Sequence, residues 1–301
     1  MIDFEHQVAV VTGAGGGLGR SHAKLLAERG AAVVVNDLGG DVSGGGSGNS
    51  MADEVVAEIR SAGGRAVAEY SSVTRSDSGE RLLEKALDEF GRLDILVNNA
   101  GILRDRSFAK LEPGEIDSVL DVHLRGAFRV TRPIFAHMKE KNYGRIVMTS
   151  SASGILGNFG QANYGAAKMG LVGLCNVLKL EASNYDIKVN AISPIARTRM
   201  TEGVFADFID SFHPESVSPV VAYFASRECE VNGDVWSVGG GQVSRFFTAL
   251  APGFFKHPVH EGPLTVEDVV GNLSEVRSEE GYLIPLSGND EFAKILPRLK
   301  E

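Results

Sequence analysis

The stretch that decides the fold is "TGAGGGLG", residues 12–19, which directly follows the apolar run "VAVV" at 8–11. Its glycines fit T-G-x-x-x-G-x-G and not the commoner G-x-G-x-x-G, because Leu18 stands where the third glycine would fall. Such glycines allow a tight turn, let a diphosphate approach the backbone and aim a helix N-terminus at its charge. A close strand–helix junction that binds no ligand can have the same glycines, but their position after the first strand favours a dinucleotide site. Its predicted contacts are Gly13, Gly15, Gly17, Leu18 and Gly19.

Short runs rich in Val and Ile alternate with amphipathic stretches along the rest of the chain. The runs are too short for helices and are apolar on both faces, which is typical of parallel strands covered on both sides. This alternation predicts an α/β fold, a Rossmann-type doubly wound parallel sheet of about seven strands, with ligands at the carboxyl ends of the strands. The expected strands are 8–13, 31–37, 65–70, 93–99, 145–151, 187–193 and 234–240, and the expected helices are 18–29, 51–62, 76–90, 112–141, 159–185 and 214–226.

Two segments depart from this alternation. Residues 39–50, "GGDVSGGGSGNS", have the composition of a flexible surface insertion. The chain after residue 244 cannot build a core of its own, although Thr265 and Asp268 fit the start of a capped helix. We therefore expect one catalytic domain, residues 1–244, and a C-terminal extension, residues 245–301, that packs on the body or on a second subunit.

The composition limits the classes of partner and compartment. A net charge of −9 over 301 residues disfavours nucleic acid and anionic membranes, both of which require basic patches. No apolar run is long enough to span a bilayer, and no secretory signal precedes the first strand. The two cysteines, Cys175 and Cys229, lack a metal-like spacing, so we expect buried free thiols, no metal site and a cytoplasmic location.

Asp37 ends the second predicted strand, 18 residues after Gly19. A carboxylate at this position can accept hydrogen bonds from the two hydroxyls of an adenosine ribose and would repel a 2′-phosphate. The glycine turn also contains no Lys or Arg that could neutralise such a phosphate. These features favour NAD over NADP, the alternative being a solvated aspartate at a strand end.

Tyr164 and Lys168 are four residues apart on a predicted helix and so share one face. A tyrosine with a pKa near 10 needs help to act as acid or base at neutral pH, and a neighbouring ammonium group favours the phenolate. Ser151 ends the preceding strand, where its hydroxyl can meet a substrate oxygen. A bare Y-x-x-x-K is usually a surface pair on a helix, but the serine 13 residues earlier and the glycine turn make an active site the stronger interpretation.

With "NNAG" at 98–101 and "YGAAK" at 164–168, these residues resemble the short-chain dehydrogenase/reductase superfamily over residues 6–241. Longer stretches, such as "NNAGILRDRSF", "VHLRGAF" and "GNFGQANY", are similar to one branch, the (3R)-hydroxyacyl-CoA dehydrogenase domains of peroxisomal multifunctional enzymes of type 2. The resemblance implies NAD-linked oxidation of a 3-hydroxyacyl-CoA. It makes Tyr164 the general base, Lys168 its electrostatic partner and Ser151 the ligand of the substrate oxygen.

The resemblance also implies cofactor contacts along three further strands. They are Ser72 and Val73 at the adenine, Asn99 with Ala100 and Gly101 after the fourth strand, and Ala196 and Thr198 at the nicotinamide carboxamide. Two departures matter. Ser72 stands where many members carry an aspartate, and "PIARTRM" at 194–200 replaces P-G-x-x-x-T, with Ile195 and Arg199 at the changed positions.

His123, in "DVHLRGAF" at 121–128, occupies the position at which most members of the superfamily carry an asparagine. In those members the backbone of the asparagine lies at a helix kink and holds a water that connects the active-site lysine to solvent, and the resemblance implies the same place for His123. Three roles stay open for His123: a hydrogen-bonded neighbour of the active site, a member of the proton relay that titrates near neutral pH, or core packing.

The evidence for the substrate comes from the resemblance, but some residues are candidates for contacts. Arg104, Arg106 and Lys256 could meet the phosphates of CoA or be solvated surface charges. Aromatic residues could line an apolar slot for the substrate, or they could pack within the protein or between subunits. Because a large exposed apolar patch is unusual in a monomer, we expect a homodimer or homotetramer. These aromatic residues are Phe205, Phe208 and Phe212 after the sixth strand and Phe246, Phe247, Phe254 and Phe255 in the extension.

Other functions are compatible with the same motifs. A hydroxysteroid dehydrogenase acting on a free 17-hydroxyl group, and a 3-ketoacyl reductase, use the same three residues. Asp37 disfavours the reductase, which normally draws on NADPH. A nucleotide sensor without catalysis is disfavoured by the intact Ser151, Tyr164 and Lys168.

Overall fold

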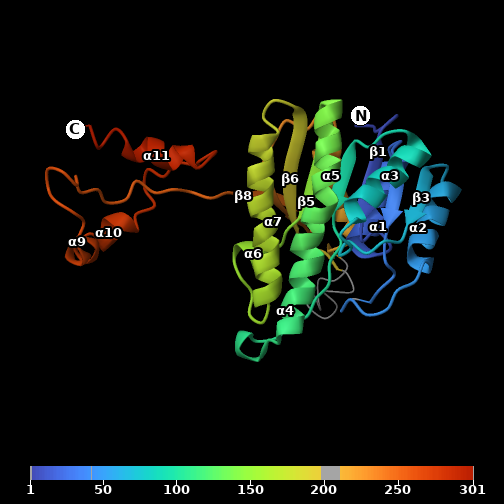
Figure 1. Ribbon diagram of the computed structural model, residues 1–301, viewed down its shortest axis with the longest axis horizontal. Coiled ribbons are helices and arrows are strands. Elements are labelled where there is room, and N and C mark those ends of the chain that lie inside the picture. Colours follow the sequence, from blue (N-terminus) through green and yellow to red (C-terminus); the bar gives the residue numbers. More distant parts are fainter. Residues whose placement is uncertain (1, 42, 198–210, 301) are drawn as a thin grey trace. The chain divides into compact units, whose positions relative to one another are not determined.

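The computed structural model describes residues 2–41, 43–197 and 211–300. The chain divides into two compact units, residues 1–245 and residues 246–301. The first unit is an α/β structure built on a single sheet (Figure 1). In the described part of the chain, no helix has both the length and the apolar character required to cross a membrane.

The sheet has the strand order β3-β2-β1-β4-β5-β6-β7-β8, and β1 to β7 pair in parallel. The chain moves outward from β1 in one direction and then returns to the other side of β1 with β4. This reversal places a crevice at the carboxyl ends of β1 and β4. The strands are β1 (Val8–Thr12), β2 (Ala32–Asn36), β3 (Arg65–Glu69), β4 (Ile95–Asn98), β5 (Tyr143–Thr149), β6 (Asp186–Pro194), β7 (Val235–Gly239) and β8 (Gln242–Phe246).

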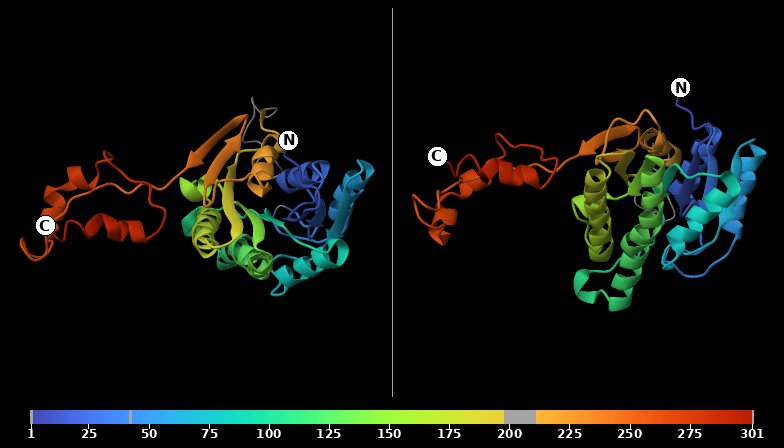
Figure 2. Two further views of the ribbon diagram at one scale, coloured as in Figure 1. Left: turned by 90° about the horizontal axis from the view of Figure 1, so that it is seen from above. Right: turned by 45° about the horizontal axis from the view of Figure 1, so that its top comes forward.

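Helices cover both faces of this sheet (Figure 2). The helices α1, α2 and α8 pack with alternate strand residues in one continuous core, while buried residues of α3, α5 and α7 face the other side. Double coverage explains why all residues of β1 and β2 are buried. The helices of this unit are α1 (Gly17–Glu28), α2 (Ser50–Ser61), α3 (Ser78–Phe90), α4 (Pro113–Leu120), α5 (Gly126–Lys141), α6 (Ala152–Ile155), α7 (Ala162–Glu181) and α8 (Ser218–Ala225), with short 3-10 turns at Phe108–Lys110 and Pro214–Ser216.

The helix expected at 112–141 is not uniform. The segment Asp121–Arg125 is π-helical and separates α4 from α5. π-helical turns are rare and occur mostly at functional sites, and this one carries His123. The helix expected at 159–185 begins three residues later, because the short α6 and a loop precede it.

An eighth strand, β8, was not predicted. Gly240 and Gly241 both have positive φ angles, +56° and +79°, as a two-residue hairpin turn of type I′ requires, and they lead from β7 directly into β8. The sequence does not indicate this strand, because it is exposed along most of its length and shows little apolar alternation.

Residues 246–300, the described part of the second unit, contain three short helices, α9 (Val266–Gly271), α10 (Leu273–Val276) and α11 (Asn289–Ile295). The predicted cap of α9 is confirmed. The Thr265 Oγ1 accepts the Asp268 N–H, and the Asp268 carboxylate accepts the Thr265 N–H. Two of the four phenylalanines pack inside this unit, Phe247 on Tyr282 and Phe255 beside His257. In the first unit Cys175 and Cys229 are free and buried, as predicted.

Candidate active site

A cavity of about 730 Å³ lies at the carboxyl ends of the strands, where the fold predicts a ligand. Most of the residues singled out in the sequence line it. They are Gly13, Gly17, Leu18, Asp37, Ser72, Val73, Asn99, Ala100, Gly101, His123, Ser151, Tyr164, Lys168 and Ala196. The structure therefore brings together segments that span more than half of the chain.

The glycine turn after β1 leaves no room for side chains. Gly13 and Gly17 have φ angles of +62° and +50°, which L side chains rarely adopt. A Cβ on Gly19 would lie 2.2 Å from the carbonyl oxygen of Gly13. Gly15 and Gly19 do not line the cavity, because Gly15 packs on Asp37 and Gly19 packs on Gly13. Helix α1 begins at Gly17 without a side-chain cap, so its first N–H groups remain available to an anion.

Asp37, directly after β2, is connected to the glycine turn. Its Oδ2 accepts the backbone N–H of Gly15 at 2.8 Å, and its Oδ1 accepts that of Gly39 at 2.7 Å. Each carboxylate oxygen can accept further hydrogen bonds, and Asp37 lines the cavity. The carboxylate thus has a fixed position from which it can bind a ribose diol.

Asn99 and Thr12 join the ends of β4 and β1. The amide of Asn99 donates to the carbonyl oxygens of Thr12 and Gly13, both at 3.0 Å. The Thr12 hydroxyl oxygen accepts the N–H groups of Asn99 and Ala100 at 3.0 and 3.1 Å. The Asn99 side chain therefore holds the glycine turn in place. The sequence analysis assigns no role to Thr12, although this residue directly precedes Gly13 in the glycine motif.

The glycine-rich loop after β2 differs from the flexible surface insertion expected from its composition. Gly40, Asp41 and Gly44 line the cavity, and a Cβ on Gly44 would lie 3.2 Å from the side chain of Ile102. Asp41 organises the loop by accepting from the N–H groups of Ser43 and Gly45 at 2.8 and 2.9 Å. Composition alone does not reveal these bonds within the loop, nor the bond from Arg104 Nε to the Ser43 carbonyl oxygen that connects it to the chain after β4.

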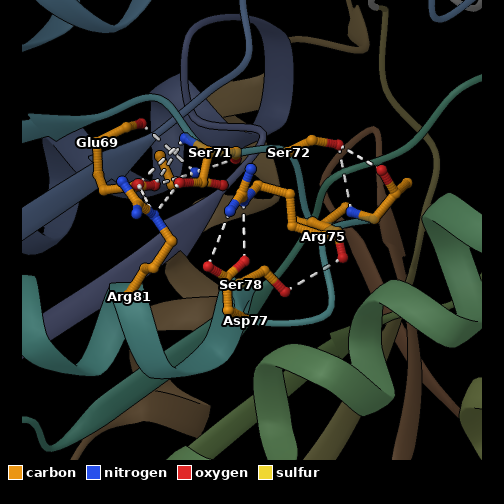
Figure 3. Close-up of polar contacts among 10 residues, drawn as sticks. Glu69, Ser71, Ser72, Arg75, Asp77, Ser78 and Arg81 are labelled. Atoms are coloured by element: carbon orange, nitrogen blue, oxygen red, sulfur yellow. Dashed lines mark hydrogen bonds and ion pairs between the residues drawn. The ribbon is translucent and has the colours of Figure 1, made fainter.

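The far end of the cavity, where an adenine is expected, is shown in Figure 3. Ser72 Oγ lies 2.8 Å from Thr74 Oγ1 and also accepts the Thr74 N–H. Glu69 is buried beneath it and accepts from the Ser71 N–H and the Asn36 amide. Arg81 lies close by, donating to Ser71 Oγ at 2.7 Å. The backbone around Ser72 is thus held by two sets of polar contacts, one at Thr74 and one at Ser71.

The three residues expected to carry the chemistry meet at the opposite end. Ser151 caps α6, and its Oγ accepts the Ser153 N–H at 3.2 Å. Tyr164 and Lys168 lie one turn apart on α7, with the Lys168 Nζ 5.4 Å from the centre of the tyrosine ring. Lys168 is buried, and its Nζ donates to the Thr149 carbonyl oxygen at 2.6 Å.

The protonation of these groups differs from the simple expectation. Burial raises the pKa of Tyr164 above its usual value, and a hydrogen bond with Ser151 counteracts part of that rise. Burial also lowers the pKa of Lys168 to about 7. The lysine is therefore only partly charged near neutral pH, and its ability to favour the phenolate is greatest below pH 7.

His123 lies beside this group and not in the general core. Its ring meets that of Tyr164 edge-on, with centroids 5.1 Å apart. Nε2 lies 3.0 Å from the N–H nitrogen and 2.8 Å from the carbonyl oxygen of Ile102, and Nδ1 is buried without a partner in the described residues. A Cβ on Gly101 would lie 2.3 Å from Cε1 of the ring, so that glycine makes room for the imidazole.

Burial, and secondarily the charge of Lys168, hold the pKa of His123 well below its ordinary value. Because the lowered pKa favours the neutral imidazole, we expect His123→Asn to leave the pH dependence of kcat/KM unchanged around and above neutral pH. Steady-state rates across the range provide the measurement. Loss of a titration step near pH 6.5 in the variant would instead identify His123 as a member of the proton relay.

Other residues expected to contact a ligand either fall outside the described residues or do not line the cavity. Thr198, Arg199, Phe205 and Phe208 fall outside the described residues. Phe212 packs against Gly240, whose Cβ would lie 2.9 Å from its ring, and does not line the cavity. The basic candidates beyond Arg104 are already paired: Arg106 with Glu115 at 2.8 Å in the first unit, and Lys256 with Asp268 at 2.5 Å in the second.

The residues present fit a dinucleotide. Gly13, Gly16 and Gly17 line the cavity with backbone alone, and α1 presents uncapped N–H groups to a diphosphate. Asp37 can bind a ribose at one end, and the buried Lys168 can bind a second ribose at the other. Ser151 and Tyr164 then lie where a substrate oxygen would meet a redox-active ring.

Comparison with known proteins agrees with this geometry. The sequence profile of the family described as "short chain dehydrogenase" matches residues 7–207. The chain is 52% identical over 274 residues to mouse peroxisomal multifunctional enzyme type 2, covering 91% of this chain but only 37% of that protein. It is 41% identical over 258 residues to a Mycobacterium tuberculosis protein named hydroxyacyl-CoA dehydrogenase ChsB1, covering 80% of each.

A solved structure gives the same result. Full-length peroxisomal multifunctional enzyme type 2 from Drosophila melanogaster superposes with a TM-score of 0.84 at 40% sequence identity. The match covers 99% of this chain and 50% of that one, so the chain spans about half of the length of that enzyme.

Proposed function

The chain belongs to the short-chain dehydrogenase family, and we propose that it oxidises a (3R)-3-hydroxyacyl-CoA thioester to the 3-ketoacyl-CoA with NAD. Membership makes it an oxidoreductase that acts on a CH–OH group with a nicotinamide dinucleotide. The observation that carries the proposal is the meeting of Ser151, Tyr164 and Lys168 at one end of the dinucleotide cavity. The similarity to proteins named multifunctional enzyme type 2 and hydroxyacyl-CoA dehydrogenase supports the thioester as substrate class.

In this mechanism the chain positions the alcohol and removes its proton. The Ser151 hydroxyl binds the substrate oxygen, and the Tyr164 oxygen accepts the hydroxyl proton as a general base. Lys168, connected to the Thr149 carbonyl, favours the phenolate when it is charged. When bound, NAD supplies an acceptor for the hydride that leaves the carbinol carbon. Of the three residues, Lys168 is buried, while Ser151 and Tyr164 are partly exposed to the cavity that the substrate enters.

The preference for NAD follows from Asp37. Its carboxylate, held by the N–H groups of Gly15 and Gly39, lies where a 2′-phosphate would have to bind. Of the residues that line this end of the cavity, none is a Lys or Arg that could neutralise that phosphate.

We expect Asp37→Ser to raise KM for NAD about 10- to 100-fold, because the variant loses charge-assisted hydrogen bonds to the ribose. KM for NADP should fall relative to that for NAD, because the repulsion is removed. Steady-state kinetics with both cofactors gives the measurement. Asp37→Asn, which keeps one acceptor oxygen, is the matched control. A wild-type enzyme that prefers NADP would contradict the assignment.

The substrate class is tested by comparing three assays on the purified protein. We expect NADH formation with 3-hydroxyacyl-CoA thioesters of short, long or steroid-linked acyl groups. Turnover of free 17-hydroxysteroids alone would favour a hydroxysteroid dehydrogenase. NADPH-linked reduction of 3-ketoacyl thioesters alone would favour a reductase.

We also propose that the chain assembles as a homodimer or homotetramer. Helix α5 exposes Phe128, and α7 exposes Met169, Val177 and Leu180. Apolar side chains of this size on two long helices are more stable when covered by a second copy.

A further inference from the structure

One cation at the rim of the cavity has no partner that would neutralise it. Arg104 lines the cavity, and its Nε donates to the Ser43 carbonyl oxygen of the glycine-rich loop at 3.0 Å. Its Nη1 and Nη2 groups make no hydrogen bond or ion pair with any residue in the described ranges. Arg106, two residues later, is paired with Glu115 and Glu112. Among the described residues, Arg106 therefore has carboxylate partners and Arg104 has none.

The position of Arg104 is fixed at two points. The amide of the buried Asn163, next to Tyr164 on α7, donates to the Arg104 carbonyl oxygen at 3.0 Å. The contact with Ser43 fixes the side chain near its guanidinium end. Much of the conformational entropy that a free arginine would lose on binding is therefore already lost, and a planar donor pair is presented at the mouth of the cavity.

The cavity near Arg104 also carries negative charges, which would repel a ligand that contains phosphate. The cavity is also lined by Asp41 and Asp105, and these carboxylates take donors other than Arg104. Asp41 accepts from Ser43 and Gly45, and Asp105 accepts from Gln161 at 2.6 Å. Two carboxylates near the rim repel an approaching phosphate, and Arg104 is the nearby group that can offset this repulsion.

We propose that Arg104 binds a phosphate group of the CoA portion of the substrate and so selects CoA thioesters over uncharged alcohols. The proposal rests on the proposed function, because it requires a CoA thioester as substrate. A guanidinium with two free donors matches a phosphate in a bidentate geometry. An uncharged steroid alcohol would gain nothing from this contact.

The test compares a 3-hydroxyacyl-CoA with the same acyl group on N-acetylcysteamine, which lacks the phosphates. For Arg104→Gln we expect KM for the CoA thioester to rise about 10- to 100-fold, the range of a charge-assisted hydrogen bond. KM for the truncated thioester and for NAD should stay within about twofold. In the wild type, added salt should raise KM for the CoA thioester, and this dependence should weaken in the variant.

Arg106→Gln is the matched control, since it removes an arginine two residues away that is already paired with carboxylates. It should leave KM for the CoA thioester unchanged. Arg104→Lys should restore part of the affinity, because it keeps the charge but loses the planar donor pair. Thermal unfolding of each variant shows whether the fold is retained.

The results that would overturn the proposal are distinct from one another. An unchanged KM for the CoA thioester in Arg104→Gln would overturn this inference alone. A rise in KM for NAD would assign Arg104 to the diphosphate of the cofactor instead. Equal rises for both thioesters would show a general distortion of the site. If the wild type oxidises neither thioester and turns over only free steroids, the proposed function fails and this inference fails with it.

Discussion

Replacing Tyr164 with phenylalanine should lower kcat for alcohol oxidation by about 10²- to 10⁴-fold, the contribution of a positioned general base. The variant loses the oxygen that accepts the substrate proton but keeps the ring that packs against His123 and lies near Lys168. Steady-state rates of NADH formation at saturating substrate measure the change. We expect a similar loss in kcat/KM, since the interaction is made only in the transition state.

The control for this variant is binding of the cofactor. NAD affinity, measured by calorimetry, should stay close to that of the wild type, because the glycine turn and Asp37 are distant in sequence and make no contact with the phenol. A Tyr164→Phe enzyme that kept kcat within about threefold of the wild type would show that another group is the base.

Replacing Lys168 with methionine should abolish most activity and at the same time stabilise the protein. Burial lowers the pKa of Lys168 from its ordinary value to about 7, so the folded state releases a proton that the unfolded chain keeps up to about pH 10. This destabilising effect is complete below pH 7 and is progressively relieved as the pH rises from 7 to about 10. Methionine has a similar length and no charge to bury.

Denaturant unfolding at pH 6.5 and at pH 9.5 measures this effect. At the lower pH we expect the variant to exceed the wild type by on the order of 2 kcal/mol or more, after allowance for the lost bond to Thr149. The difference should shrink at the higher pH. A variant that is less stable than the wild type at pH 6.5, or a gap that does not depend on pH, would contradict a Lys168 whose pKa is lowered by burial.

Much of the site was predictable because it follows from rules that act locally. The φ angles at Gly13 and Gly17 and the close packing of Gly19 on Gly13 disfavour side chains in the turn, and a carboxylate at the end of the second strand must lie near it. Ser151, Tyr164 and Lys168 follow from one strand end and one turn of helix. Strand and helix order then fixes which ends meet, since parallel strands gather their carboxyl ends at one edge.

The remainder depends on contacts between segments that are distant in sequence. The residue types in "DVHLRGAF" do not show a π-helical turn, although the family resemblance implies a kink there; in the structure His123 in this turn contacts Ile102, and Gly101 leaves space for its ring. The glycine-rich loop is connected to the chain after β4 by the bond from Arg104 to Ser43, 61 residues apart. The role of Asn163, which holds Arg104 beside the catalytic helix, likewise requires the folded chain.

The central claim is that this chain oxidises a (3R)-3-hydroxyacyl-CoA with NAD. The most direct measurement is the rate of NADH or NADPH formation when the purified protein is given the 3R or the 3S epimer of one hydroxyacyl-CoA with NAD or NADP. We predict rapid formation of NADH from the 3R epimer and little product in the other three combinations. Turnover of the 3S epimer alone, a preference for NADP, or no turnover of either epimer would contradict the claim.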